Sequence, residues 1–430
     1  MNFHDTYEVN SINKVEYSIT RGFDKSITQM DNDVKIIGVL GINGKTTTAH
    51  IIEEIFTNSG YRTGLISSLG LKINGKYILN KEEIDTYSTV DLMDKFKYKN
   101  IDIIIIEISF EDISLISEYN IEFDIVINTN NYEKINYNSI IKKYREEKKK
   151  LFDSLAKNKI AIINQDDKNS VNLVQSNNNI VVITYGFNGK ASVTASSLQL
   201  DKVSDFNLCL QRGITTINGV QIDPLEFPIS LNLLGSYNIY NCLAAISTCL
   251  CFGIDIKVIS ETLMKIKGLS RRLNKVYDKD FLVIDAFTNN PLSYDAVFHT
   301  IQNLDYNNLI VINSIDEDDE NEVSRDNIEI ISEWIDILKA NDIILSLGTD
   351  VTEKKDKCLN KLILDYEKKF KENNIKYSVY DRLEDSINNA LKICKKNDIV
   401  LLLGAEGMNK GENILLKAIY NKQKLSFLKS

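Results

Sequence analysis

A glycine-rich turn, placed between an apolar run and an amphipathic segment, constrains this chain more than any other feature. Residues 36–40 are mostly apolar and predict a buried strand, and the turn GINGKTTT at residues 41–48 follows directly. Apolar residues then recur at helical spacing from Ile51 to Phe56, and Gly60 ends the predicted helix. A strand, a glycine turn and a helix N-terminus in this order bind nucleotide phosphates, because backbone amides and the helix dipole face the anion.

The turn supplies the candidate phosphate-binding residues. Its glycines allow close approach of a phosphate, the lysine adds a point charge, and the hydroxyl of Thr46 suits a magnesium ion. Val39 stands where the usual P-loop pattern has a further glycine, so an ordinary glycine turn before a helix is the alternative. The candidate residues are Gly41, Asn43, Gly44, Lys45, Thr46 and Thr47.

Length and charge limit the possible classes of protein. A chain of 430 residues allows two or three domains. A hydrophobic content of 43% with 26% charged residues is ordinary for a globular protein. The formal net charge of −9 argues against a nucleic-acid partner, since phosphate contacts need a basic surface. The sequence indicates no oligomeric state.

Three further features favour a cytoplasmic protein. Residues 1–33 are polar, too few for a domain, and carry no signal-peptide pattern, so they predict a short N-terminal extension. The apolar run at residues 103–106 is far too short to span a membrane. The six cysteines show no paired spacing, which predicts reduced thiols without a zinc site or a disulfide framework.

A second buried strand ends in a carboxylate. Residues 101–109 form a nearly continuous β-branched run, which is typical of a central parallel strand covered on both faces. Chemistry gathers at the carboxyl ends of strands in open α/β sheets, so Glu107 is well placed to help bind magnesium. A solvent-facing carboxylate at a strand end is the alternative.

Strand and helix patterns alternate along most of the chain and predict the α/β class. Residues 190–232 instead predict short antiparallel strands, and the alternation restarts after Leu273. We therefore expect a P-loop domain with a mostly parallel sheet at residues 34–273, followed by a Rossmann-like α/β domain at residues 274–430. The acidic stretch at residues 314–326 predicts a solvated loop.

Eight motifs in order resemble those of the Mur ligase family, the ATP-dependent ligases that join an amino acid or amine to a carboxylate. The match covers residues 35 to about 300 well and the remainder loosely. The motifs are GINGKTT (41–47) for GTNGKTT, STVD (88–91) for TTPD, EIS (107–109) for EVSS, YREEKKKLF (144–152) for YxxxKxxLF, NQDD (164–167) for NADD, LGSYNIYNCLAA (234–245) for LxGxxNxxNxxAA, GLSRR (268–272) for GxxGR and DAFTNNPLS (285–293) for DxYNANPxS.

The resemblance implies roles for ATP and Mg²⁺ at particular residues. Lys45 and the loop amides would bind the β- and γ-phosphates, and Thr46 and Glu107 would bind magnesium. Lys148 matches a lysine that the family carbamylates, and the carbamate would bind a second magnesium ion. Lys45, Glu107 and Lys148 are thus the expected catalytic residues.

The resemblance also implies the nucleoside contacts and the reaction. Asn238, Arg272 and Asp285 match positions around the adenine and ribose. Arg272 would reach across from the hinge, which is the GLSRR segment at residues 268–272, and Asp285 from the second domain. The implied reaction forms an acyl phosphate from a small-molecule carboxylate, which an amino acid or amine then attacks. Closure of the domains would exclude water from the acyl phosphate.

Three departures from the family pattern leave the substrates open. Lys134 stands where the family has a metal-binding histidine, so Glu133 replaces it, the second magnesium site is lost, or Lys134 itself supplies the charge. About thirty-five residues before the glycine turn cannot form the family's UDP-binding domain. A DNPR-like motif is also absent, and the nearest segment, at residues 347–352, has no arginine.

The main hypothesis is an ATP- and Mg²⁺-dependent carboxylate–amine ligase that resembles the Mur ligases, related to the synthesis of cell-wall peptides. The alternative is a non-catalytic ATP-binding relative that acts as a regulatory or partner subunit. Lys134 favours this alternative, whereas Lys45, Thr46, Glu107 and Lys148 favour the enzyme. A third hypothesis, an enzyme like folylpolyglutamate synthase, matches the glycine turn less well.

Overall fold

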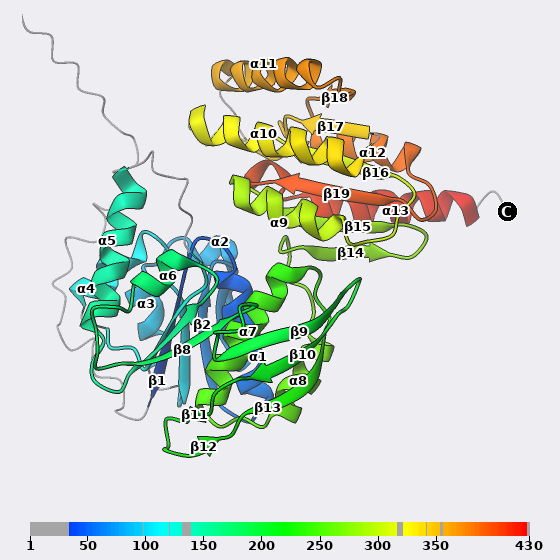
Figure 1. Ribbon diagram of the computed structural model, residues 1–430. Helices are drawn as coiled ribbons and strands as arrows, with labels where there is room; N and C mark the ends of the chain where they lie inside the picture. The colour runs from blue at the N-terminus through cyan, green and yellow to red at the C-terminus, as the bar shows by residue number, and fades with distance from the viewer. Residues whose placement is uncertain are drawn as a thin grey trace, which may run out of the picture.

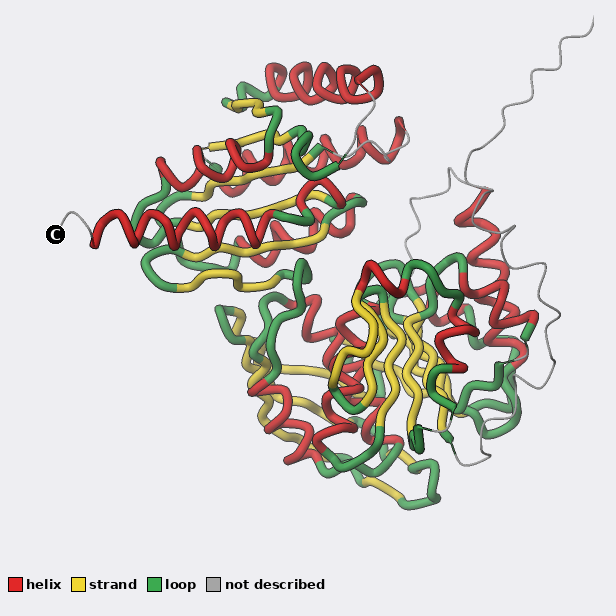
Figure 2. The backbone as a smooth tube through the Cα atoms, turned by 180° about the vertical axis from the view of Figure 1, so that it is seen from behind, coloured by secondary structure: helices red, strands yellow, loops and turns green. Residues whose placement is uncertain are grey.

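The computed structural model describes residues 34–97, 99–119, 121–130, 139–315, 321–340, 342–352 and 356–427. The expected N-terminal extension at residues 1–33 lies outside the described residues, as do Glu133 and Lys134. The described part of the chain is built around two large sheets that lie in separate units, each covered by helices (Figures 1 and 2). None of its helices has both the length and the apolar character needed to cross a bilayer.

The larger sheet contains eleven strands: β1 (Lys35–Leu40), β2 (Thr63–Ser67), β3 (Gly70–Ile73), β4 (Lys76–Asn80), β5 (Ile103–Glu107), β6 (Ile125–Asn128), β7 (Ile160–Asn164), β8 (Val181–Gly186), β9 (Val193–Leu200), β10 (Ser204–Leu210) and β13 (Leu225–Leu231). Their order is β13-β10-β9-β8-β7-β6-β1-β5-β2-β3-β4. The central strands run parallel, with β1 between β5 and β6. A short hairpin of β11 (Ile214–Thr215) and β12 (Gln221–Ile222) stands apart from this sheet.

The stretch at residues 190–232 extends the parallel sheet instead of leaving it. β10 pairs with β9 and β13 in the predicted antiparallel manner. β9, however, pairs in parallel with β8, at Tyr185 opposite Val193 and Gly186 opposite Thr194. An unpaired strand edge exposes backbone donors and acceptors, so β9 satisfies the edge that β8 would otherwise present.

Two groups of helices cover the faces of this sheet. One face carries α1 (Lys45–Asn58), α7 (Ser236–Cys251) and α8 (Ile256–Lys265). The other face carries α3 (Thr89–Asp94), α4 (Asp112–Glu118), α5 (Ser139–Ser154) and α6 (Lys168–Asn172). A single helical turn, α2 (Lys81–Ile84), follows the edge strand β4.

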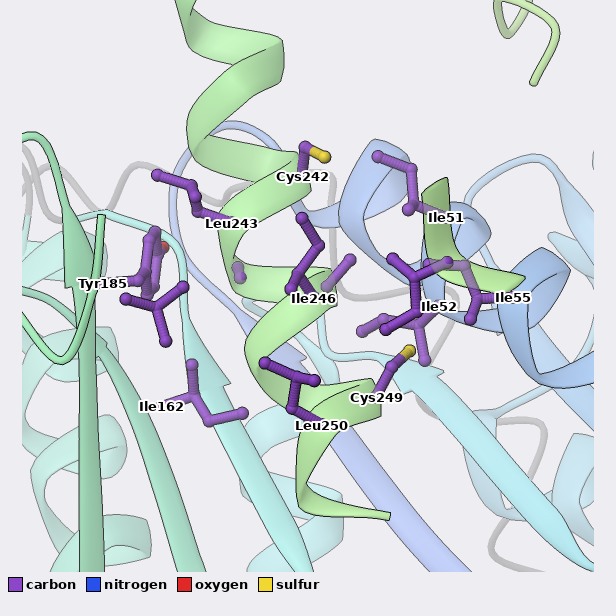
Figure 3. Packing of buried hydrophobic residues seen from close by; sticks show 14 of the residues in the cluster. Ile51, Ile52, Ile55, Ile162, Tyr185, Cys242, Leu243, Ile246, Cys249 and Leu250 are labelled. Atoms are coloured by element: carbon purple, nitrogen blue, oxygen red, sulfur yellow. The ribbon is translucent and has the colours of Figure 1, made fainter. Parts of the chain in front are cut away.

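The isoleucine run of β5 explains why both faces are covered. Successive side chains of a strand point to opposite faces, so Ile103 and Ile105 join the core under α1 and α7, whereas Ile104 and Ile106 join the other core. Figure 3 shows the first core, where α1 and α7 pack against each other through Ile51, Ile52, Ile55, Cys242, Ile246 and Cys249. Five cysteines whose side chains the structure describes are free thiols: Cys209, Cys242, Cys249, Cys251 and Cys394.

The second unit contains a six-stranded sheet of β14 (Asn274–Asp278), β15 (Leu282–Phe287), β16 (Leu309–Ser314), β17 (Asp342–Ser346), β18 (Tyr377–Tyr380) and β19 (Ile399–Gly404), in the order β14-β15-β19-β16-β17-β18. Only β14 is antiparallel to its neighbour. One face packs on α9 (Pro291–Ile301), α10 (Asn321–Leu338) and α11 (Asp356–Glu372), and the other on α12 (Leu383–Ile393) and α13 (Gly411–Phe427). The predicted α/β class with two such units is confirmed.

Candidate functional site

The glycine turn between β1 and α1 has a shape that only glycine permits at two positions. Gly44, the residue before α1, has φ +87°, and an added Cβ would lie 2.3 Å from Asn241 Oδ1. Gly41 has φ +138°, and its Cβ would lie 1.9 Å from Thr129 Oγ1. Because the capping residue of α1 is a glycine, no side chain covers the first amides of the helix. This end of α1 is therefore suited to an anion.

Two residues at the end of β6 hold the turn in place. Asn130 Oδ1 accepts hydrogen bonds from the amides of Ile42 and Asn43, at 3.1 and 3.0 Å. The carbonyl of Asn43 accepts in return from Asn130 Nδ2 at 3.0 Å and from Thr129 Oγ1 at 2.6 Å. The sequence analysis did not identify either residue. The signal was available, because polar residues at the carboxyl end of a strand beside β1 meet the same sheet edge.

Thr46 and Glu107 lie in contact at the start of α1. Thr46 Oγ1 donates to Glu107 Oε1 at 2.8 Å, and the amide of Ser68 donates to Glu107 Oε2 at 2.8 Å. The strand register explains this contact, because Glu107 pairs with Val39 at the end of β5 where β1 enters the glycine turn. Among the described residues no three His, Cys, Asp or Glu side chains gather as metal ligands. A hydroxyl and one carboxylate fit Mg²⁺, which keeps most of its ligands as water and phosphate oxygens.

Two partly buried cations, Lys45 and Arg272, lie beside this single carboxylate. Lys45 Nζ donates to the carbonyl of Ile42 at 3.1 Å, and Arg272 Nη2 donates to Thr46 Oγ1 at 3.4 Å. Burial lowers the pKa of both side chains, and the negative charge of Glu107 opposes that shift in both. Arg272 Nε is buried and has no hydrogen-bond partner among the described residues. The cluster thus carries more positive charge than its carboxylate neutralises, which suits a phosphate group.

The structure places Arg272 at the glycine turn, whereas the resemblance implied a position near the nucleoside. Asn238 lies on α7, donates to the carbonyl of Leu234 at 2.8 Å and accepts from Asn241 Nδ2 at 3.0 Å. Asn241 Oδ1 in turn accepts from Thr48 of α1 at 3.4 Å. Asn238 is therefore tied to the first turn of α1 through Asn241, a residue that the sequence analysis quoted within a motif without assigning it a role.

Asp285 lies apart from this cluster in contact with a different arginine. Its side chain is 0% exposed, and Arg271 Nε donates to Asp285 Oδ1 at 3.4 Å. Burial raises the pKa of Asp285 to about 6, although Arg271 acts in the opposite direction. The structure therefore brings together Lys45, Thr46, Glu107 and Arg272, and it places Asp285 in the interior of the second unit.

Lys148 lies on α5 with its amine enclosed by other residues. It is 1% exposed, donates to Asn128 Oδ1 at 3.0 Å and lies 4.9 Å from the centre of the Tyr144 ring. Burial lowers the pKa of Lys148 to about 7, with a smaller opposite effect of Asp167. A neutral amine is what attack on carbon dioxide requires, so this environment fits a carbamate. Its role as a metal ligand stays a prediction.

The second unit also touches the glycine turn directly. The side-chain amides of Asn43 and Asn290 donate to each other, at 3.4 Å in both directions. Asn290 is at the same time the N-cap of α9, where its Oδ1 accepts from the amide of Ser293 at 3.0 Å. Together with Arg272, this pair joins the two units across the candidate nucleotide site.

A cavity of about 600 Å³ lies between the units. The first unit contributes Glu82 of α2, and the second unit contributes residues of three segments. Its polar lining includes Thr352, Glu406, Asn409, Lys410 and Lys417. The cavity therefore presents both carboxylates and ammonium groups to a ligand.

Residues 39–249 match the family described as the Mur ligase middle domain. The chain is 29% identical over 296 residues to a UDP-N-acetylmuramoyl-L-alanyl-D-glutamate–2,6-diaminopimelate ligase of Bacillus velezensis, covering 66% of this chain and 57% of the relative. A ligase of the same description from Clostridium acetobutylicum is 26% identical over 379 residues, covering 86% and 73%. The crystal structure of MurF ligase from Thermotoga maritima in complex with ADP superimposes with a TM-score of 0.66 at 15% identity, covering 91% of this chain and 81% of that chain.

These comparisons confirm the resemblance that the motifs predicted. The structural likeness extends over both units, but at 15% identity it supports the fold alone. The chain spans less than two thirds of the length of the Bacillus velezensis relative.

Proposed function

Since this chain is a relative of the Mur ligases, we propose that it is an ATP- and Mg²⁺-dependent ligase that joins a carboxylate to an amine. The observation that carries the proposal is the cluster at the start of α1. There, Lys45 and Arg272 surround the Thr46–Glu107 pair at a helix end without a side-chain cap. Such a cluster fits a polyphosphate with its metal ion and has no other evident partner among the described residues.

Each residue of the cluster has a role in this proposal. Lys45, Arg272 and the first amides of α1 bind and orient the phosphates, and their charge stabilises the transferring phosphoryl group. Thr46 and Glu107 hold the metal ion. When bound, Mg²⁺ supplies Lewis-acid polarisation of the phosphoryl oxygens. Lys148, as a carbamate, would extend the ligand set toward a second ion.

The proposed reaction forms and consumes an acyl phosphate. The substrate carboxylate attacks the γ-phosphorus and ADP leaves. The amine then attacks the acyl carbon, loses a proton and displaces inorganic phosphate. The cavity between the units is our candidate site for the amine, because its carboxylates can accept from an ammonium group and its lysines can bind a carboxylate.

The relatives' descriptions suggest the class of substrate. They name a ligase that joins diaminopimelate to a UDP-linked muramoyl peptide. We propose an acid and an amino acid of this general kind, both of them small molecules, with no role for nucleic acid.

The decisive experiment measures phosphate release by the purified chain with ATP and Mg²⁺. Pooled amino acids are tested with candidate carboxylates, including UDP-muramoyl peptides. We expect release that needs both an acid and an amine. Lys45→Ala should reduce it by about 100-fold or more, because a charge at the transferring phosphate is lost. Lys190→Ala, which removes an exposed lysine of the same unit, is the matched control.

Two outcomes would contradict the proposal. Unchanged release in Lys45→Ala would exclude the glycine turn as the phosphate site. Tight ATP binding without release in any pool would favour the non-catalytic alternative. The carbamate is tested separately with carbon-13 bicarbonate, which should give a carbamate resonance that is lost in Lys148→Arg.

A further inference from the structure

Arg271 occupies a backbone conformation that side chains other than glycine rarely adopt. Its φ is +59°, in the left-handed region, and the GxxGR pattern has a glycine at this position. The side chain is nevertheless buried, with Arg271 only 8% exposed. An arginine held in this conformation requires contacts that offset the unfavourable backbone.

The guanidinium group of Arg271 makes those contacts with one short segment. Nη1 donates to Asn409 Oδ1 at 2.8 Å and to the carbonyl of Ala405, and Nη2 donates to the carbonyl of Gly404. Nε completes the set through Asp285 Oδ1. The planar guanidinium group offers five donors in a rigid fork that matches acceptors spread around its edge, whereas the three donors of a lysine ammonium all leave one nitrogen atom. Arg271 therefore fixes the backbone between Gly404 and Asn409 from the side of the hinge.

The same segment forms one wall of the cavity between the units. Glu406, Asn409 and Lys410 line the cavity together with Glu82 of the first unit. Ser270, next to Arg271, adds a weaker hydrogen bond to Glu412 at 3.5 Å, just beyond this wall. The hydrogen bonds of Arg271 and Ser270 therefore end on, or next to, groups that a ligand in the cavity would meet.

Arg271 is also connected to the nucleotide site. The next residue, Arg272, contacts Thr46. Both guanidinium carbons lie over the ring of Phe287, at 5.3 Å for Arg271 and 5.2 Å for Arg272. The amide of Phe287 donates to the carbonyl of Arg271 at 2.7 Å. Arg271 and Arg272 thus pack on the same Phe287 ring, with Arg272 reaching the glycine turn and Arg271 reaching the cavity wall.

We propose that Arg271 is a positioning residue that fixes the 404–409 segment of the cavity wall and links this wall to the nucleotide site through Arg272 and Phe287. The link rests on the proposed function, because it requires nucleotide at the glycine turn. The positioning itself does not, since Arg271 makes its contacts with residues of this chain.

Hydrogen–deuterium exchange of the full chain tests the positioning without nucleotide. In Arg271→Gly, amides of the 404–410 region should exchange about tenfold faster or more, because the hydrogen bonds that hold the segment are lost. Glycine adopts the left-handed conformation without strain, so the hinge backbone is preserved. Arg62→Ala is the control, since it removes an equally forked but exposed pair with Asp102.

Arg271→Lys keeps the charge beside Asp285 but lacks the fork, and it should show a smaller acceleration in the same region. It also serves if Arg271→Gly does not fold. Exchange at residues 404–410 that equals the wild type in the lysine and glycine variants would overturn the positioning. So would an acceleration at residues 404–410 that is no larger than the acceleration in the rest of the second unit, which would indicate a merely structural role.

A second arm adds Mg²⁺ with the non-hydrolysable analogue AMP-PNP, whose binding is measured by calorimetry. In the wild type, bound nucleotide should slow exchange at residues 404–410, and in Arg271→Gly it should slow exchange only at the glycine turn. Binding that leaves residues 404–410 unchanged in the wild type overturns the link. Absence of binding to the wild type overturns the proposed function and the link together, whereas the nucleotide-free arm still decides the positioning.

Discussion

Arg271 is buried and the adjacent Arg272 is partly buried, and their surroundings differ sharply. The guanidinium group of Arg271 donates to four acceptors of the second unit. Among the described residues, the guanidinium group of Arg272 donates one hydrogen bond, from Nη2 to Thr46 Oγ1 at 3.4 Å, and its Nε has no partner. Buried donors in proteins are normally satisfied. The difference therefore distinguishes an arginine that builds the site from one whose donors are available to a ligand.

Among the variants that test this difference between the two arginines, Arg271→Ala should have the largest effect on the free energy of unfolding. It leaves Asp285 buried without its cation, and it should lower the free energy of unfolding at pH 7 by about 3–5 kcal/mol. Urea unfolding at pH 7 measures the loss. Adding Asp285→Asn should recover part of it, because the stranded charge is removed. An equal loss in the single and double variants would show that the pair is not the cause.

Arg272→Ala should have the opposite profile. Affinity for Mg²⁺–ATP, measured by calorimetry, should fall about 100-fold, or about 2.7 kcal/mol, because a phosphate loses a buried cation. The free energy of unfolding should stay the same or rise, since an incompletely satisfied charge is removed. A variant that binds ATP normally but unfolds more easily would reverse our assignment of the two arginines.

The pH dependence of the free energy of unfolding tests the environment of Asp285, the partner of Arg271. Its pKa is raised to about 6 in the folded protein, above the usual 3.9 of the unfolded chain. Between these values the folded state binds more protons, so the stability from this group is present below pH 4 and lost as pH rises through 6. The loss is about 3 kcal/mol, because the two pKa values differ by about two units. In Asp285→Asn this component of the pH dependence should vanish, and an unchanged curve would exclude Asp285 as its source.

The smallest effect is expected at Asn290, which contacts both units. Asn290→Ala removes the N-cap of α9 and should cost about 1 kcal/mol in thermal unfolding. Asn290→Ser keeps a capping side chain but is too short to reach Asn43. It should therefore retain stability and lose only the contact with the glycine turn. Equal destabilisation by alanine and serine would show that the contact between units, not the cap, carries the stability.

The sequence predicted the parts of the site that local patterns determine. The strand, glycine turn and helix at residues 36–56 were recognisable because each signal lies within a few residues of the next. Glu107 was found because a carboxylate followed a buried isoleucine strand, and the parallel register with β1 then places it beside Thr46. Local patterns thus recovered three of the four residues of the phosphate cluster, Lys45, Thr46 and Glu107.

The remaining contacts depend on pairings that no local pattern specifies. Asn130, Asn241 and Asn290 reach the glycine turn from three distant segments, and single asparagines carry no signature of that position. The backbone of the hinge is left-handed at Arg271 and at Leu273. This local turn places Arg272 beside Thr46 and Arg271 beside Asp285. The sequence did contain two unused signals: the polar residues Thr129 and Asn130 directly after β6, and Asn290 before Pro291, which marks the start of α9.

The unmatched donors of Arg272 have a practical consequence for handling the protein. A site with surplus positive charge is expected to bind inorganic phosphate or sulfate from the buffer. The buffer therefore affects both the stability and the ATP affinity that are measured. An anion that binds only the folded chain adds about 2.7 kcal/mol of apparent stability at a hundred times its dissociation constant. Melting temperatures recorded in phosphate and in a zwitterionic buffer would therefore differ, and ATP titrations in phosphate would report competition instead of intrinsic affinity.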